Sequence, residues 1–187
     1  MHERGVTLQF CGFGGQGIIL SSVTLGAAAV TKAGLNACQT QSYGSEARGG
    51  ECQAEVIVSE KPIDSPVADQ ADILVAMSQS AYHRYIGRLR LGGTLIYDPE
   101  LVDCGELRKD IQVVSVPATQ IASEIGSKLS ANMVILGFLQ QATGMFTEND
   151  LLGAIRENVR ERFLKVNLEA AKRGMELSKI QGARVEV

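Results

Sequence analysis

The sequence is poor in the residues from which disulfides and metal sites are built. It has four cysteines and two histidines among 187 residues, and no two cysteines have the CxxC spacing of a metal-binding pair. A chain of this length buries enough apolar surface to fold without disulfides. We therefore expect reduced thiols, a cytoplasmic location, and no metal ion or iron–sulfur cluster held by this chain alone.

Basic residues are not in excess, and charge of either sign is missing from a long early stretch. Lys and Arg number 18 and Asp and Glu number 21, which gives a net charge of −3 at pH 7. Nucleic-acid-binding domains are usually basic, so this balance argues against a nucleic-acid partner. Residues 5–31 contain no charged side chain, but their many glycines and polar residues argue against a membrane span. We expect this stretch to be covered by its own fold or by partner chains.

Apolar residues recur with strand-like and helix-like periods in alternation along the chain. Strands are predicted at residues 6–11, 36–41, 51–58, 73–77, 94–97 and 113–116, and helices at residues 18–33, 78–89, 118–125, 131–142, 151–158 and 160–178. This order predicts a three-layer α/β fold with a mostly parallel twisted sheet, helices on both faces and a helical C-terminal region. No linker divides the chain, so residues 1–187 are expected to form a single domain.

Two local signals sharpen these boundaries. Gly92 and Gly93 predict a turn between a helix and the strand that begins at Thr94. Thr147 and Asp150 have the three-residue spacing of a capping box, which predicts the start of a helix.

A glycine-rich segment follows the first predicted strand and opens the first predicted helix. It reads Gly12-Phe13-Gly14-Gly15-Gln16-Gly17. Glycines let a ligand approach exposed backbone N–H groups, and a helix N-terminus favours negative charge. Gly12, Gly14, Gly15, Gln16 and Gly17 are therefore candidates for binding an anionic cofactor. A tight strand-to-helix turn without a ligand is the alternative.

An NAD site needs more than this glycine motif. It also uses an acidic residue at the end of the second strand, where the carboxylate holds the ribose hydroxyls. The corresponding segment here reads Gln39-Thr40-Gln41-Ser42, with no carboxylate before Glu46. The sequence therefore argues against a nicotinamide cofactor.

A second distinctive segment reads Tyr43-Gly44-Ser45-Glu46-Ala47-Arg48-Gly49-Gly50. Glu46 and Arg48 end a stretch in which Lys32 is the only charge after Arg4, so we expect their charges to have specific partners. An ion pair within the loop is one reading. The other is a loop at the carboxyl ends of the strands that meets a ligand or another subunit. The candidates are Tyr43, Ser45, Glu46, Arg48 and Gly49.

Together the two segments resemble the gamma subunits of 2-oxoacid:ferredoxin oxidoreductases and the matching domain of single-chain pyruvate enzymes. Further matches of lower specificity are Ala71-Asp72-Ile73-Leu74-Val75-Ala76-Met77, Asn132-Met133 with Leu136-Gly137, and Asn167-Leu168 with Ala170-Ala171. The resemblance covers almost the whole chain. The form of the segment 43–50 is most similar to the 2-oxoglutarate branch of the family.

The resemblance implies a non-autonomous enzyme subunit. The family's reaction is the oxidative decarboxylation of a 2-oxoacid with CoA, which gives acyl-CoA, CO2 and a reduced ferredoxin or flavodoxin. Thiamine diphosphate, Mg and 4Fe–4S clusters are implied on alpha, beta and delta partner subunits, with CoA as a substrate. The resemblance makes Gly14, Gly15, Gln16 and Gly17 candidate contacts to CoA phosphate or to a neighbouring subunit. A stand-alone regulatory or NAD-dependent nucleotide-binding module is the alternative function.

Overall fold

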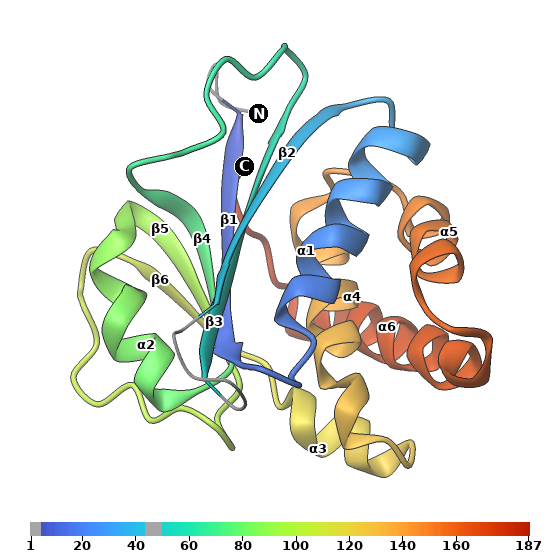
Figure 1. Cartoon of the computed structure of the whole chain (residues 1–187). Coiled ribbons are helices and arrows are strands. Elements are labelled where there is room, and N and C mark those ends of the chain that lie inside the picture. The colour runs from blue at the N-terminus through green and yellow to red at the C-terminus, as the bar shows by residue number, and fades with distance from the viewer. Residues whose placement is uncertain (1–4, 44–49) are drawn as a thin grey trace.

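The computed structural model describes residues 5–43 and 50–187. Within them a six-stranded sheet has the order β2-β3-β1-β4-β5-β6 (Figure 1). β1 pairs in parallel with β4, β4 with β5, and β5 with β6, whereas β3 is antiparallel to both of its neighbours. The strands are β1 Val6–Phe13, β2 Asn36–Tyr43, β3 Glu51–Ser59, β4 Ala71–Ala76, β5 Leu89–Tyr97 and β6 Gln112–Ser115.

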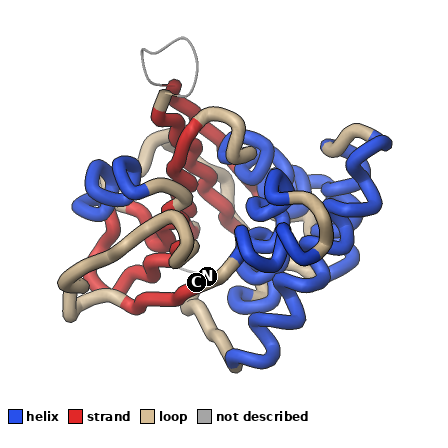
Figure 2. The backbone as a smooth tube through the Cα atoms, turned by 90° about the horizontal axis from the view of Figure 1, so that it is seen from below, coloured by secondary structure: helices blue, strands red, loops and turns tan. Residues whose placement is uncertain are grey.

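Helices cover both faces of this sheet, as the sequence predicts. α2 lies alone on one face in Figure 1, and α1, α3, α4, α5 and α6 lie on the other. Figure 2 shows the strands between these two helical layers. The helices are α1 Ile18–Ala27, α2 Gln79–Tyr85, α3 Ala118–Glu124, α4 Ala131–Thr143, α5 Glu148–Asn158 and α6 Glu161–Gln181. In the described part of the chain, no helix is long and apolar enough to cross a membrane.

Alternation along β1 explains why the sheet is covered on two sides. Val6, Leu8 and Phe10 belong to the large core on the side of α1 and α4. Cys11 belongs instead to the smaller core beneath α2, together with Tyr82. Successive side chains of a strand point to opposite faces, so this short apolar strand supplies both cores.

The direction of β3 and the course of β5 were not predicted. A mostly parallel sheet is confirmed, but β3 runs against its neighbours β1 and β2. The turn predicted at Gly92 and Gly93 is wrong, because both residues lie inside β5. Gly92 has a φ of 70°, and the β4–β5 register shifts between Ala71 and Ile73. The glycines therefore bend one continuous strand, as glycine does at irregular positions in sheets.

The predicted capping box of α5 is confirmed, and it gives a first testable expectation. The Thr147 side chain accepts a hydrogen bond from the Asp150 N–H, and the Asp150 carboxylate accepts one from the Thr147 N–H. Thr147→Ala should lower the free energy of unfolding by about 1 kcal/mol, because it leaves a helix-terminal N–H without its partner. Urea denaturation measures the change. The control Thr31→Ala removes an exposed hydroxyl from a helical turn and should change stability by less than about 0.5 kcal/mol. Equal losses in both variants would contradict the capping role.

Candidate functional site

The glycine-rich turn lies at the carboxyl end of β1, where sheets of this kind place their sites. It connects β1 to α1, whose N-cap is Gly17. The Gly14 N–H donates a hydrogen bond to the Gly50 carbonyl at 3.0 Å, just before β3. Gly14 and Gly15 are exposed. The turn therefore presents backbone to solvent between the end of β1 and the start of α1, as predicted from the sequence.

Two glycines of the turn are required by their backbone or by a close neighbour. Gly15 and Gly17 have φ values of 99° and 75°, a region that only glycine adopts without strain. A Cβ on Gly17 would also lie 2.4 Å from the Asn132 amide nitrogen. A Cβ on Gly15 would meet nothing within 4 Å. The space over Gly15 is thus open to a ligand, whereas the space over Gly17 is filled by the protein.

Side-chain amides hold the turn from two directions. The Gln16 side chain accepts a hydrogen bond from the Phe13 N–H and donates one to the Met77 carbonyl, both at 2.6 Å. On the other side, Asn132 Nδ2 of α4 donates to the Gly17 carbonyl at 3.3 Å. Side-chain amides that bond to backbone groups in this way fix a backbone conformation. The conformation of the glycine turn is therefore held by specific side-chain hydrogen bonds.

A cleft of about 380 Å³ opens beside this turn. Gly15 and Gly17 form one side of it, and residues from α4, the α5–α6 connection and α6 form the other, among them Asn132, Arg160 and Phe163. Asn132 is buried, whereas Arg160 and Phe163 are exposed. The cleft thus combines exposed glycine backbone, a cationic side chain and an aromatic ring. Its size is within the range of small-molecule sites.

The second predicted segment lies largely outside the described residues. Ser45, Glu46, Arg48 and Gly49 belong to it. Its described flanks lie next to the glycine turn, because Tyr43 pairs with Cys52 and Cys52 pairs with Gly12. Tyr43 and Gly50, which flank residues 44–49, therefore lie at the same end of the sheet as the turn.

An ion pair lies at the same end of the sheet, between α2 and β3. Arg84 of α2 contacts Glu51 at the start of β3, with 3.0 Å between Nη1 and Oε2. The hydrogen bond to Glu51 raises the pKa of the exposed Arg84 guanidinium. Arg84 also lies over the ring of Tyr85, 5.6 Å from its centroid. These contacts tie α2 to the strand that follows residues 44–49.

The cysteines of the described residues are free thiols, as predicted, and two of them pack as apolar residues. Cys11 and Cys52 are buried in β1 and β3. Burial raises the pKa of both thiols, and the neighbouring Cys52 and Glu51 raise that of Cys11 further. These thiols therefore stay protonated and unreactive at neutral pH. Across residues 5–43 and 50–187, no three His, Cys, Asp or Glu side chains are placed to hold a metal ion together.

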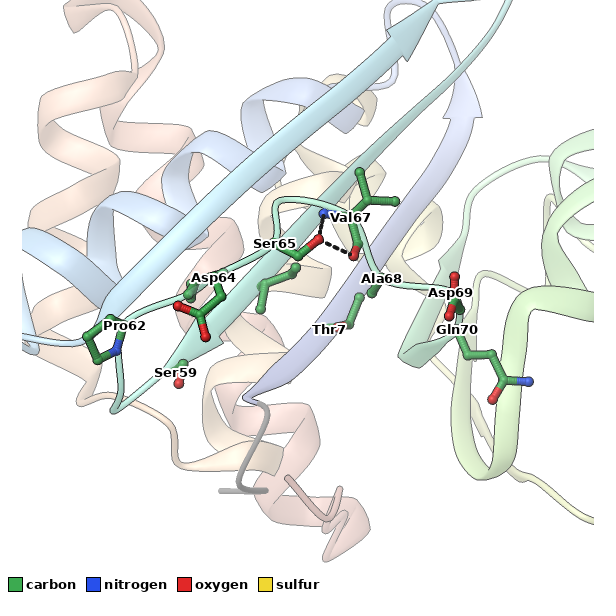
Figure 3. A pocket seen from close by; sticks show the side chains of 11 residues that line it. Thr7, Ser59, Pro62, Asp64, Ser65, Val67, Ala68, Asp69 and Gln70 are labelled. Atoms are coloured by element: carbon green, nitrogen blue, oxygen red, sulfur yellow. Dashed lines mark hydrogen bonds between the residues drawn. The ribbon is translucent and has the colours of Figure 1, made fainter.

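A larger cavity, of about 700 Å³, lies elsewhere. Figure 3 shows it between the loop that follows β3 and the sheet, with Thr7, Ser59 and Gln70 among its labelled residues. Thr7 is the second residue of β1, and Gln70 precedes β4. The cavity is therefore at the amino ends of the parallel strands, away from the glycine turn. Asp64 and Asp69 on its wall make it unsuited to an anion.

Three cleft residues were not identified as site residues from the sequence. Asn132 appeared only within a match of low specificity, and Arg160 only as the first residue of a predicted helix. Phe163 carried no signal. Their common feature is that they line the same cleft as a turn more than a hundred residues away, and Asn132 also bonds to Gly17 across 115 positions. Only the packing of α4 and α6 brings them together.

Comparison with known proteins gives the family. The pyruvate ferredoxin/flavodoxin oxidoreductase model matches residues 7–177. The 2-oxoglutarate synthase subunit KorC of Methanothermobacter marburgensis is 43% identical over 91% of this chain and 95% of its own length. The KorC subunit of Methanocaldococcus jannaschii is 41% identical over 96% and 99%.

Solved structures agree with the sequence relatives. The gamma subunit of a keto/oxoacid ferredoxin oxidoreductase from Geobacter sulfurreducens superposes with a TM-score of 0.82 at 34% identity, over 94% of this chain and 99% of that one. A 2-oxoglutarate:ferredoxin oxidoreductase from Magnetococcus marinus gives a TM-score of 0.87 at 28% identity, over 96% of this chain and 32% of that one. The resemblance read from the motifs is thus confirmed, and the chain belongs to the pyruvate ferredoxin/flavodoxin oxidoreductase family.

Proposed function

We propose that this chain is the gamma subunit of a multi-subunit 2-oxoglutarate:ferredoxin oxidoreductase. The observation that carries the proposal is near-complete mutual coverage, at 41–43% identity, with proteins named as 2-oxoglutarate synthase subunits. The ketoisovalerate and indolepyruvate relatives are less similar, at 27–32% identity. The whole chain acts as one gamma domain in this proposal, and its unpaired cysteines suit a cytoplasmic location.

The reaction needs groups that the proposal assigns to partner subunits. In the overall reaction 2-oxoglutarate and CoA give succinyl-CoA and CO2, and the electrons pass to ferredoxin or flavodoxin. Thiamine diphosphate with Mg, and 4Fe–4S clusters, supply the carbanion stabilisation and the electron transfer. We place these on alpha, beta and delta subunits. The part of this chain is to bind CoA beside that centre and to help assemble the complex.

The glycine turn and its cleft suit the CoA contribution. CoA is an anionic phosphate ester with a long uncharged arm and an adenine ring. The N-terminus of α1 favours phosphate, and Arg160 supplies a positive charge at the cleft. Phe163 and the exposed Leu129 supply apolar wall. The Magnetococcus marinus enzyme, which contains a domain of this fold within a longer chain, was solved with 2-oxoglutarate, coenzyme A and succinyl-CoA bound.

The segment 43–50 is proposed to face the partner subunits or the active site. Its described flanks leave the sheet next to the glycine turn, so a neighbouring chain that meets one segment meets the other. Glu46 and Arg48 provide charges for such a contact, and Tyr43, Ser45 and Gly49 lie in the same segment. Paired charges of this kind give an interface its specificity.

Copurification and a substrate panel test the proposed function. An affinity-tagged chain expressed in its native cells should bring down thiamine-enzyme and ferredoxin-like subunits. That complex should reduce a viologen dye with 2-oxoglutarate and CoA at least about tenfold faster, as kcat/KM, than with pyruvate or 2-oxoisovalerate. A complex that prefers another 2-oxoacid would refute the substrate. A chain that purifies without partners would refute the subunit role.

The alternative of an NAD-dependent or regulatory nucleotide module is not favoured by the relatives. Calorimetric titration of the assembled complex separates the two. CoA should bind, and NAD, NADP and ATP should give no saturable heat. Saturable NAD binding with no response to CoA would favour the alternative.

A further inference from the structure

Both polar atoms of the Gln16 side-chain amide make hydrogen bonds within the protein. Its Oε1 accepts from the Phe13 N–H and its Nε2 donates to the Met77 carbonyl, each at 2.6 Å. The first bond closes the glycine turn on itself. The second joins the turn to the residue after β4, 61 positions away. An amide is suited to this task because it carries a donor and an acceptor on one rigid group.

The first glycine of the motif makes room for this amide. A Cβ on Gly12 would lie 2.5 Å from Gln16 Oε1 and 2.9 Å from the Ile18 side chain. The absence of a side chain at Gly12 is thus explained by a contact within the chain. Gly17 is explained in the same way by Asn132. Gly14 and Gly15 remain as the exposed glycines of the turn.

Met77 lies where two strand-to-helix connections meet. Its N–H donates to the Cys11 carbonyl at 2.9 Å, and the following Ser78 caps α2 by accepting from the Ala81 N–H. Gln16 therefore joins the β1–α1 turn to the β4–α2 turn. Without the Gln16 amide, the glycine turn would lose its side-chain hydrogen bond to the Met77 carbonyl at the end of β4. Asn132 holds the turn from the opposite side.

We propose that Gln16 is a positioning residue for CoA binding, which holds the glycine turn so that the exposed Gly15 presents its backbone N–H to the ligand. This proposal rests on the proposed function, because it assumes that the glycine turn contacts CoA. In this proposal Gln16 acts through the turn, because each polar atom of its amide already bonds to the protein backbone. This role differs from the direct ligand contact expected from the motif.

The test is Gln16→Glu in the assembled enzyme. The substitution keeps the length and the acceptor for the Phe13 N–H, but a carboxylate cannot donate to the Met77 carbonyl and is repelled by it. At about pH 8 the KM for CoA should rise about fivefold while kcat stays within about twofold of native. Toward about pH 5.5 the carboxyl gains a proton, because a facing carbonyl oxygen disfavours its charged form. The donor is then restored, and the ratio of variant to native KM should fall toward one.

Two further variants separate positioning from general damage. Gln16→Met removes both hydrogen bonds without adding charge, so its KM for CoA should be raised at every pH. Gln79→Glu makes the same chemical change in an amide that bridges backbone groups of Asp103 and should leave the KM for CoA unchanged. A native KM in Gln16→Met, or a pH-independent ratio in Gln16→Glu, overturns the proposal. A native complex that does not require CoA overturns the proposed function instead.

Discussion

Replacing Gly137 by alanine should lower the free energy of unfolding by about 3 kcal/mol, the upper part of the usual range for overpacking. α4 and α6 cross with their backbones in contact at this point. A Cβ on Gly137 would lie 1.8 Å from the Ala171 carbonyl oxygen. At the facing position, a Cβ on Gly174 would lie 1.9 Å from the Val134 carbonyl oxygen. Neither oxygen can move without its helix, so the substitution must separate the two helices.

Urea denaturation of native and variant chains measures this effect. Gly153→Ala is the matched control, because it adds the same methyl group to a helical glycine whose nearest neighbour is the flexible end of Lys32, at 3.2 Å. That variant should gain up to about 1 kcal/mol from helix propensity. Gly174→Ala should behave like Gly137→Ala. Stability equal to native in both core variants would show that the helices do not pack this closely.

Charge reversal at Arg160 should raise the KM of the assembled enzyme for CoA about tenfold, which corresponds to about 1.4 kcal/mol. Arg160 lines the cleft beside Gly15 and Gly17, so Arg160→Glu replaces attraction for a phosphate by repulsion. The side chain is exposed, and solvent therefore limits the effect to this modest size. The KM for 2-oxoglutarate should not change, because the proposal assigns that site to partner subunits.

Arg162→Glu is the control for Arg160→Glu. Arg162 is also exposed in the same helical region and stacks on the ring of Phe163 at 4.5 Å, but it does not line the cleft. Arg162→Glu changes the net charge by the same amount as Arg160→Glu and should alter the KM for CoA less than twofold. The difference between the variants should shrink as salt is raised, because exposed charges are screened. Equal effects would mean that net charge, and not the cleft, governs CoA binding.

Much of the fold could be predicted because local signals agree with the tertiary structure. Each strand predicted from apolar runs exists, and the capping box at Thr147 sets the start of α5. The direction of β3 could not be predicted, since pairing between strands leaves no mark in a single strand's composition. The turn predicted at Gly92 and Gly93 was wrong because glycine occurs both in turns and at bends within a strand. Only the pairing of β5 with β4 distinguishes the two.

The position of the candidate site along the chain could be predicted, but its three-dimensional contacts could not. The glycine motif after β1 located the turn, and the missing acidic residue after β2 argued against NAD. The roles within the motif depend on distant partners, as with Gln16 at Met77 and Gly17 at Asn132. Arg160 and Phe163 reach the cleft only through the packing of α6 on α4. Sequence spacing carries no information on such contacts, because they are set by helix packing.

Adding the chain back to its partner subunits tests the central claim most directly. The other subunits are purified without it, and succinyl-CoA formation from 2-oxoglutarate, CoA and oxidised ferredoxin is followed as the chain is titrated in. The account predicts that formation is negligible at first, rises with added chain, and saturates at one copy for each copy of the catalytic partners. Full succinyl-CoA formation in the absence of the chain would contradict it.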